Sequence, residues 1–448
     1  MELKDTVAAI DWSEVTEQAT ELLREYIRID TTNPPGGEEA GAQFLRRELE
    51  REGFESRFYD AGDSRVSISA RLPATEGGSG KPIVLLSHVD VVPAEPEHWK
   101  RDPFSGDIVD DVIWGRGALD MKGMGIMELM VLALAKRHGL PLKHDIVFLA
   151  VADEEEGGHK GVRFLQEAAP ELFDAELVIN EGAYGFSNFM GQDVTMFGLC
   201  PSEKSPCWIK LRAVGSPGHA SVPHANNAVV RLARALARIE SREQSVRITE
   251  PVQAMFRTLS ARGLVPAEVD LEDLETVEAV AAVDAHVGAI TRDTVNLTGM
   301  HAGHKHNVIP AEAEATIDCR LLPDTDPDRF VAELTELIDD PKVEVIRVLE
   351  HDSGQTSLDT PFTKTVAEVV AERYGEQGHV VPMLSPGFTD SHAFRAAGVD
   401  AYGFIPALLT REELSTIHGH NERISRTNLS LATQMLFDVV GRLARRGC

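Results

Sequence analysis

The sequence is poor in cysteine and in basic residues, and it contains no long apolar run. Four cysteines among 448 residues are too few for a disulfide framework. Lysine and arginine number 44 against 72 acidic residues, and the net charge of -28 argues against partners such as nucleic acid or anionic lipid. The longest apolar helical run, 126–135, contains Glu128 and is far shorter than a membrane span.

The N-terminal residues lack a basic region followed by an apolar core, so no signal peptide is expected and we predict a cytoplasmic location. Hydrophobic residues make up 43% of the sequence and can fill a large core. A chain of this length usually divides into two domains. We predict a discontinuous α/β domain over 1–203 and 352–448. Residues 204–351 would form an inserted domain of order β-α-β-β-α-β, interrupted by a charged helical insertion near 243–293.

One short stretch of the first part carries a histidine and an acid at the end of an apolar run. Residues 82–86 are apolar almost throughout and predict a buried strand of a parallel sheet, which is followed by His88 and Asp90. Side chains two positions apart on a strand point to the same side. In one interpretation, His88 binds a metal and the carboxylate of Asp90 holds its ring. In the other, His88 is a surface histidine beside a turn that contains Asp90.

Further acidic or imidazole side chains follow other predicted strands and turns, namely Asp120, Glu154, Glu155, Glu181 and His418. Taken singly, such residues are typical of turns or of charged helix starts. Carboxylates gathered at one sheet edge repel one another unless a cation lies between them. A pair of divalent ions with one bridging carboxylate would resolve this repulsion and leave room for a shared water.

Five segments that carry these residues together resemble the motifs of the M20 metallopeptidase family. They are Ser87-His88-Val89-Asp90-Val91-Val92, Gly115-Arg116-Gly117-Ala118-Leu119-Asp120-Met121-Lys122-Gly123, Asp153-Glu154-Glu155-Glu156-Gly157-Gly158, Asn180-Glu181-Gly182 and His418-Gly419-His420-Asn421-Glu422-Arg423. The resemblance implies a zinc-peptidase-like, three-layer α/β/α catalytic domain. It also implies that the inserted domain is an α+β, two-layer, ferredoxin-like lid or dimerisation domain.

The resemblance further implies two divalent metal ions, with zinc as the first choice, although cobalt and manganese accept the same ligands. One ion would be held by His88, Asp120 and Glu181. The other would be held by Asp120, Glu155 and His418, so that Asp120 bridges the two.

Two further acids receive roles from the resemblance. Asp90 would orient the ring of His88, and Glu154 would be the general base. The family also has a cis peptide bond after the bridging aspartate, which here is the bond between Asp120 and Met121.

The inserted domain resembles the family as well. The segment Gly215-Ser216-Pro217-Gly218-His219-Ala220-Ser221 is similar to its motif. In dimeric members the histidine of this motif, here His219, supports the oxyanion in the partner's site. The resemblance therefore implies a homodimer, and it places Asn307 and Arg320 at the substrate.

One position departs from the family pattern. His392 in Thr389-Asp390-Ser391-His392 stands where other members have an arginine for the substrate carboxylate. An imidazole is mostly neutral at pH 7, so we expect a weaker, pH-dependent anchor and a broader or larger substrate. Arg320 and Arg395 are the candidates to compensate, with some carboxylate preference kept through Arg320.

The resulting hypothesis is a metal-dependent amidohydrolase that cleaves N-acyl amino acids, dipeptides or related small amides. A phosphoesterase is disfavoured because few basic residues lie near the motifs, and a serine hydrolase because no Gly-x-Ser-x-Gly occurs. The alternative is a catalytically inactive binding or regulatory protein on the same scaffold.

Overall fold

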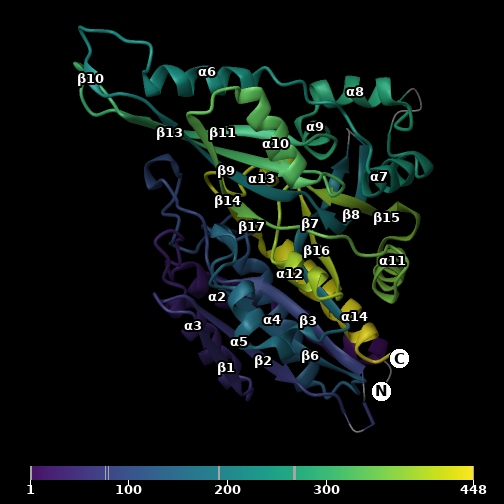
Figure 1. Cartoon of the computed structure of the whole chain (residues 1–448). Coiled ribbons are helices and arrows are strands. Elements are labelled where there is room, and N and C mark those ends of the chain that lie inside the picture. Colours follow the sequence, from purple (N-terminus) through teal and green to yellow (C-terminus); the bar gives the residue numbers. More distant parts are fainter. Residues whose placement is uncertain (1–2, 76, 79, 190–191, 266–268, 447–448) are drawn as a thin grey trace.

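A mixed eight-stranded sheet forms the centre of the computed structural model, which describes residues 3–75, 77–78, 80–189, 192–265 and 269–446 (Figure 1). Its strands, in spatial order, are β1 (Ser56–Asp60), β2 (Val66–Leu72), β6 (His144–Val151), β3 (Gly80–His88), β7 (Leu177–Phe189), β16 (Asp400–Leu409), β8 (Gln192–Glu203) and β15 (Gly378–Ser385). β3 runs parallel to both β6 and β7, and β16 runs parallel to β7. Both ends of the chain therefore contribute strands to one sheet.

Helices cover the two faces of this sheet. They are α1 (Leu3–Ala9), α2 (Trp12–Ile27), α3 (Glu38–Arg51), α4 (Lys122–Arg137), α5 (Val162–Ala168), α11 (Pro361–Tyr374), α12 (Ser391–Ala396) and α14 (Arg426–Leu443). Alternate residues of β3 enter different cores: Leu85 packs in the core with α2, α4 and α14, whereas Val84 and Leu86 pack with α5 and α12. The alternation follows from the two-residue period of a strand. The expected three-layer α/β/α architecture is confirmed.

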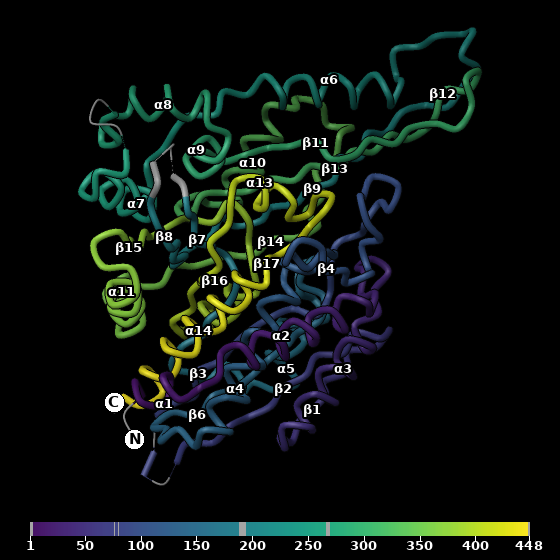
Figure 2. The backbone as a smooth tube through the Cα atoms, turned by 180° about the vertical axis from the view of Figure 1, so that it is seen from behind, coloured from purple at the N-terminus to yellow at the C-terminus, as the bar shows by residue number. Residues whose placement is uncertain are grey.

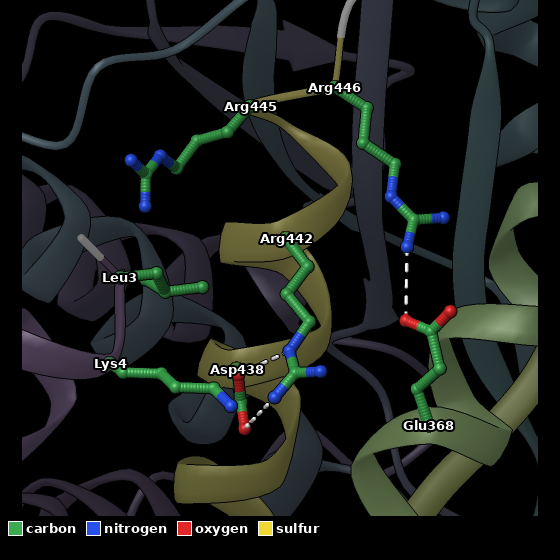
Figure 3. Close-up of a pocket in the computed structure, with 7 residues that line it drawn as sticks. All are labelled: Leu3, Lys4, Glu368, Asp438, Arg442, Arg445 and Arg446. Atoms are coloured by element: carbon green, nitrogen blue, oxygen red, sulfur yellow. Dashed lines mark hydrogen bonds and ion pairs between the residues drawn. The ribbon is translucent and has the colours of Figure 1, made fainter.

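Both chain ends meet at the amino ends of the central strands. The carbonyl of Ala444, just after α14, accepts hydrogen bonds from the backbone of Lys143 and His144 at the start of β6. Leu3 and Lys4 of α1 line a shallow cleft of about 420 Å³ beside Arg442 (Figure 3). Every strand end that carries the predicted site lies at the opposite edge of the sheet.

A second, antiparallel sheet has the order β11-β13-β9-β14. It consists of β9 (Ser205–Val214), β11 (Thr294–Ala302), β13 (Glu312–Leu321) and β14 (Val343–Glu350), with α6 (Ala228–Glu240) and α10 (Pro327–Ile338) packed on one face. The two-layer β-α-β-β-α-β arrangement is therefore confirmed. The strands β10 (Gly218–His219) and β12 (Val308–Ile309) pair in an arm beyond α6, which both views place at one extremity of the molecule (Figures 1 and 2). The exact limits 1–203, 204–351 and 352–448 stay a prediction.

The insertion near 243–293 is helical, as expected, and it packs on the central sheet. Its helices are α7 (Glu250–Ala261), α8 (Leu274–Val283) and α9 (Ala285–Ile290). Val252 and Phe256 of α7 share a core with Val381 and Leu384 of β15. The insertion thus covers the far end of the eight-stranded sheet.

Shorter elements complete the fold. They are the three-stranded sheet of β4 (Asp107–Val109), β5 (Val112–Trp114) and β17 (Arg423–Ser425), the helix α13 (Arg411–Leu414), and 3₁₀ turns at Pro96–His98, Glu154–Glu156, Pro170–Phe173 and Gly375–Gln377. Among the described residues, we find no helix whose length and apolar character would let it cross a bilayer.

Candidate metal centre and active site

The carboxyl ends of β3 and β6 and the interior of β7 bring the first predicted ligands together; Glu181 was expected after a strand, but it lies within β7, which continues to Phe189. β3 ends at His88, and the parallel register pairs this residue with Val151 of β6. His88 Nε2 lies 3.1 Å from Asp120 Oδ1 and 3.5 Å from Glu181 Oε1. The three side chains predicted to hold one ion therefore converge on one point.

The second predicted set meets the first at Asp120. His418 Nε2 lies 3.1 Å from Asp120 Oδ2 and 3.2 Å from Glu155 Oε2. Each carboxylate oxygen of Asp120 thus faces a different imidazole, as a bridging carboxylate requires. The peptide bond between Asp120 and Met121 is cis, as the resemblance implied.

The electrostatics of this cluster fit a divalent cation. Burial, and then the charge of Glu181, raises the pKa of Glu154 well above its usual range. Burial, and then the charge of Asp120, does the same for the pKa of Glu181. Glu155 Oε1 is buried and has no hydrogen-bond partner in the described part of the chain. Imidazole nitrogens and carboxylate oxygens are the donors that zinc, cobalt and manganese accept, so the residues present fit such an ion.

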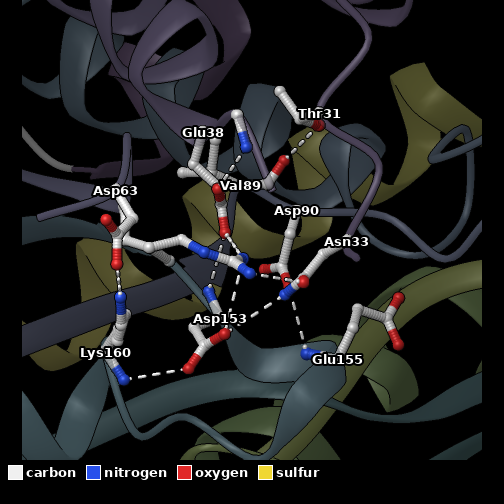
Figure 4. A network of polar contacts seen from close by, with 12 residues as sticks. Thr31, Asn33, Glu38, Asp63, Val89, Asp90, Asp153, Glu155 and Lys160 are labelled. Carbon is white, nitrogen blue, oxygen red and sulfur yellow. Dashed lines mark hydrogen bonds and ion pairs between the residues drawn. The ribbon is translucent and has the colours of Figure 1, made fainter. Parts of the chain in front are cut away.

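Asp90 lies between Asn33 and the backbone of Glu155 (Figure 4). Its carboxylate is fully buried and accepts from the backbone N–H groups of Glu154 (3.2 Å) and Glu155 (3.1 Å). His88 Nδ1 lies 2.9 Å from the backbone carbonyl of Asp90 but 3.6 Å from its carboxylate. The contact that sets the tautomer of His88 is thus with the main chain of Asp90, while its carboxylate fixes the 154–155 turn.

Asn33 is a supporting residue that the sequence reasoning missed. Its Nδ2 donates to Asp90 Oδ2 over 2.8 Å, and its Oδ1 accepts from Arg65 Nη2 over 2.8 Å. Arg65 in turn donates to the buried carboxylate of Glu38 over 2.5 Å (Figure 4). The asparagine precedes two prolines in the loop that follows α2, and such a sequence is typical of a helix stop.

Glu422 is a second residue that was missed. Its carboxylate is fully buried, and it accepts from the backbone of Leu119 (2.7 Å) and Asp120 (3.0 Å) and from Arg116 Nη1 (2.8 Å). The signal was available, because Glu422 lies within the same short segment as His418. Its task is to hold the turn that presents Asp120.

His219 and Asn307 lie close to each other, but they lie away from the cluster of predicted metal ligands. His219 pairs with Val308 across the two-stranded arm, and the carbonyl of Asn307 accepts from the backbone of Ala220 over 3.1 Å. Both side chains are exposed, and the arm extends beyond α6 (Figure 2). Within one chain, neither residue joins the metal ligands.

Arg320 and His392 lie at an aromatic wall instead, formed by Trp208, His351 and Phe388. The guanidinium of Arg320 lies over the rings of Phe388 (4.7 Å) and Trp208 (5.7 Å), and it binds both carboxylate oxygens of Asp318. His392 stacks on His351 with ring centroids 3.7 Å apart.

Arg395, the other candidate for a carboxylate anchor, is buried. It donates to the carbonyls of Ser353 and Ala401, and its Nη1 lies 3.3 Å from Glu203 Oε1. The expectation that Arg395 could compensate for His392 is wrong, because its guanidinium is buried and bound to Glu203 and to main-chain carbonyls.

Comparisons with known proteins agree with this geometry. The chain is 30% identical over 374 residues to the N-fatty-acyl-amino acid synthase/hydrolase PM20D1 of Xenopus tropicalis, covering 80% of this chain and 72% of that protein. It is 28% identical to aminoacylase-1A of Rattus norvegicus, covering 90% of each.

Solved structures with the same fold include the M20 family metallo-carboxypeptidase Sso-CP2 of Sulfolobus solfataricus, with a TM-score of 0.73 at 21% identity over 94% of this chain and 98% of that one. The di-peptidase Dug1p of Saccharomyces cerevisiae gives 0.76 at 16% identity over 99% and 98%. Residues 84–442 match the sequence profile of the peptidase family M20/M25/M40, and the chain belongs to that family.

Proposed function

We propose that this protein is a metal-dependent amidohydrolase that cleaves the amide bond of N-acyl amino acids, dipeptides or related small amides. The observation that carries the proposal is the position of Asp120, whose two oxygens face His88 and His418 over 3.1 Å each. The relatives that act on fatty-acyl amino acids and the dipeptidase with the same fold support this substrate class.

The proposed ligands of one ion are His88, Asp120 and Glu181, and those of the other are Asp120, Glu155 and His418. Zinc is the first choice, and cobalt or manganese would accept the same donors. When bound, the ions supply Lewis acidity to the scissile carbonyl group.

Glu154 is the proposed general base. Its side chain is 6% exposed, and its backbone is fixed by Asp90, so the carboxylate is held beside the ligands without being needed as one. Glu154 would take a proton from the attacking water and return it to the leaving nitrogen. A carboxylate whose pKa burial raises is suited to both steps.

We infer that the active form is a homodimer. His219 and Asn307 lie on an arm that does not reach the cluster of its own chain, so a second copy would have to supply them. β11 is the first strand in its sheet, and Leu297 and Met300 on it are 50% and 70% exposed. An apolar edge strand of this kind is suited to pairing with a second chain. We also propose that residues 204–351 form the inserted domain. A cytoplasmic location is a further part of the proposal.

Hydrolysis assays test the proposal. Protein loaded with zinc should release the amino acid from N-acyl amino acids and dipeptides and the amino acid amide from the terminal amides, and the variant Glu154→Gln should not. Metal-loaded protein that hydrolyses no member of the panel would favour the binding or regulatory alternative. The intact ligand set and Glu154 argue against that alternative.

A further inference from the structure

His392 has one ring nitrogen that is left to accept a hydrogen bond. Its Nδ1 lies 3.0 Å from the backbone carbonyl of Thr389, which can only accept, so Nδ1 must carry the proton. In a neutral imidazole the other nitrogen, Nε2, then has a free lone pair. In the described part of the chain no group donates to Nε2, and the residue keeps 6% of its surface exposed.

The surroundings of His392 keep the ring neutral. Burial lowers its pKa to about 4, and the charges of Arg163 and Arg395 act in the same direction. The stacked ring of His351 is half-buried, burial lowers its pKa to about 2, and neither of its nitrogens has a hydrogen-bond partner among the described residues. Asp390, the acid next to this helix start, is itself buried, and burial raises its pKa well above the usual range.

The segment that carries His392 is tied to the metal cluster. Asn180, which directly precedes Glu181, donates from Nδ2 to the hydroxyls of Thr389 (3.3 Å) and Ser391 (3.1 Å). From the other side, Leu349 packs against Gly157, two residues after Glu155, and leads into His351. The pair of imidazoles therefore lies between two loops that border the cluster.

Arg320, the arginine on the aromatic wall, is already engaged by Asp318. Nε and Nη2 of Arg320 bind the two oxygens of Asp318 over 2.7 and 3.0 Å, so a fork-like contact to a substrate carboxylate would have to displace Asp318. Around Arg320, the half-buried rings of Trp208, His351 and Phe388 offer apolar surface rather than charge.

We propose that His392 makes this site select a substrate group that donates a hydrogen bond, such as an amide N–H beside a large apolar residue, in place of a carboxylate. This inference rests on the proposed function and narrows its substrate class. A lone pair repels a carboxylate, whereas it pairs with the N–H of a carboxamide. His392 is thus a specificity-determining residue and takes no part in bond cleavage.

The test compares three forms of one N-acyl phenylalanine: the free acid, the N-methylamide and the N,N-dimethylamide. The N-methylamide keeps one N–H donor, and the dimethylamide has none. We expect kcat/KM for the N-methylamide to exceed that for the dimethylamide by about three- to tenfold. We also expect kcat/KM for the N-methylamide to equal or exceed that for the acid. A preference for the acid, or equal rates for the two amides, would overturn the proposal.

Two variants connect the effect to the residue. His392→Phe keeps a ring to stack on His351 but removes Nε2, so the two amides should become equivalent. His392→Arg should raise the ratio of acid to N-methylamide by about ten- to a hundredfold. Melting temperature and metal content identify variants that fail to fold. If a variant does not fold, the rates of the wild-type protein on the three compounds still test the proposal. An unchanged ratio in a folded His392→Phe protein would assign the selection to another residue.

A binding measurement separates this inference from the proposed function. Dissociation constants of the same three compounds are measured by calorimetry on zinc-loaded Glu154→Gln protein. Tighter binding of the N-methylamide than of the dimethylamide, with no hydrolysis by the wild type, would sustain the inference and reject the amidohydrolase. Hydrolysis without that difference in binding would reject the inference alone. If there is neither hydrolysis nor binding, both proposals are wrong.

Discussion

Glu422 Oε1 accepts hydrogen bonds from the consecutive backbone N–H groups of Leu119 and Asp120, over 2.7 and 3.0 Å. This contact joins a segment near the C-terminus to the turn that presents Asp120, across 302 residues of sequence. Arg116 balances the charge of Glu422 over 2.8 Å, and both side chains are almost fully buried. The position of the proposed bridging carboxylate thus depends on an ion pair that holds the backbone of Asp120 and not its side chain.

Glu422→Gln should therefore lower both stability and metal content. The substitution leaves the Arg116 charge buried without its partner, which costs about 3–5 kcal/mol in comparable cases. The matched control is Glu412→Gln, because Glu412 is exposed and its pair with Arg423 contributes roughly 0–1 kcal/mol. Equal unfolding free energies for the two variants would show that the buried pair does not hold this turn.

Glu154→Gln should bind metal normally and lose turnover. The amide keeps the size of the side chain but cannot accept the proton, so kcat should fall by at least about a hundredfold. Metal analysis and kinetics on the same sample measure the two effects. Activity within tenfold of the parent would reject Glu154 as the base.

Asp120→Ala should release metal. Both imidazoles lose their shared carboxylate, while Glu155 and Glu181 remain buried beside each other without a bridge. Replacement of the exposed Glu97 by alanine is the control, because it also removes one acidic side chain but should leave the metal content unchanged. If Asp120→Ala protein retained the metal content of the parent, the bridging role would be wrong.

Mixing two inactive proteins tests the role of His219 across a dimer. His219→Ala lacks the arm side chain, and Glu154→Gln lacks the base, so a mixed dimer contains one site with both groups intact. We expect partial recovery of activity after the two are mixed and allowed to exchange subunits. Verified mixed dimers without recovery would show that His219 does not act in the partner's site.

The half-buried His351 predicts a specific acid sensitivity. Its pKa is lowered from 6.5 to about 2, so between these values the unfolded chain binds a proton that the native protein does not. Stability therefore falls as the pH falls below 6.5, and this group alone should cost about 2 kcal/mol between pH 8 and pH 5. His351→Phe should remove that part of the loss, and replacement of the exposed His306 by phenylalanine should not. Denaturant unfolding at the two pH values measures it, and identical losses in the parent and His351→Phe would contradict the burial of a neutral ring.

The sequence allowed us to predict the features that short residue patterns determine. The apolar run before His88 indicated a parallel strand, and the parallel register then placed His88 and Glu181 at one edge. The sequence did not predict the long-range contacts of side chains that belong to no recognisable motif. Asn33 looked like a helix stop, although its amide binds Asp90, a partner 57 residues away.

His392 shows the same limit in another form. Its substitution for arginine was visible in the sequence, but the expectation of a pH-dependent anchor assumed an ordinary imidazole. Burial keeps the ring neutral near pH 7, and the bond to Thr389 places its proton on Nδ1; both depend on tertiary packing that no local sequence pattern shows.

The central claim is that amide hydrolysis depends on metal held by the Asp120 cluster. The direct test is the rate of N-acyl amino acid hydrolysis by chelator-treated protein, measured as zinc is added back. We predict negligible activity in the metal-free protein and a rise that levels off near about two zinc ions per chain. Full activity in protein shown to be metal-free would contradict the account.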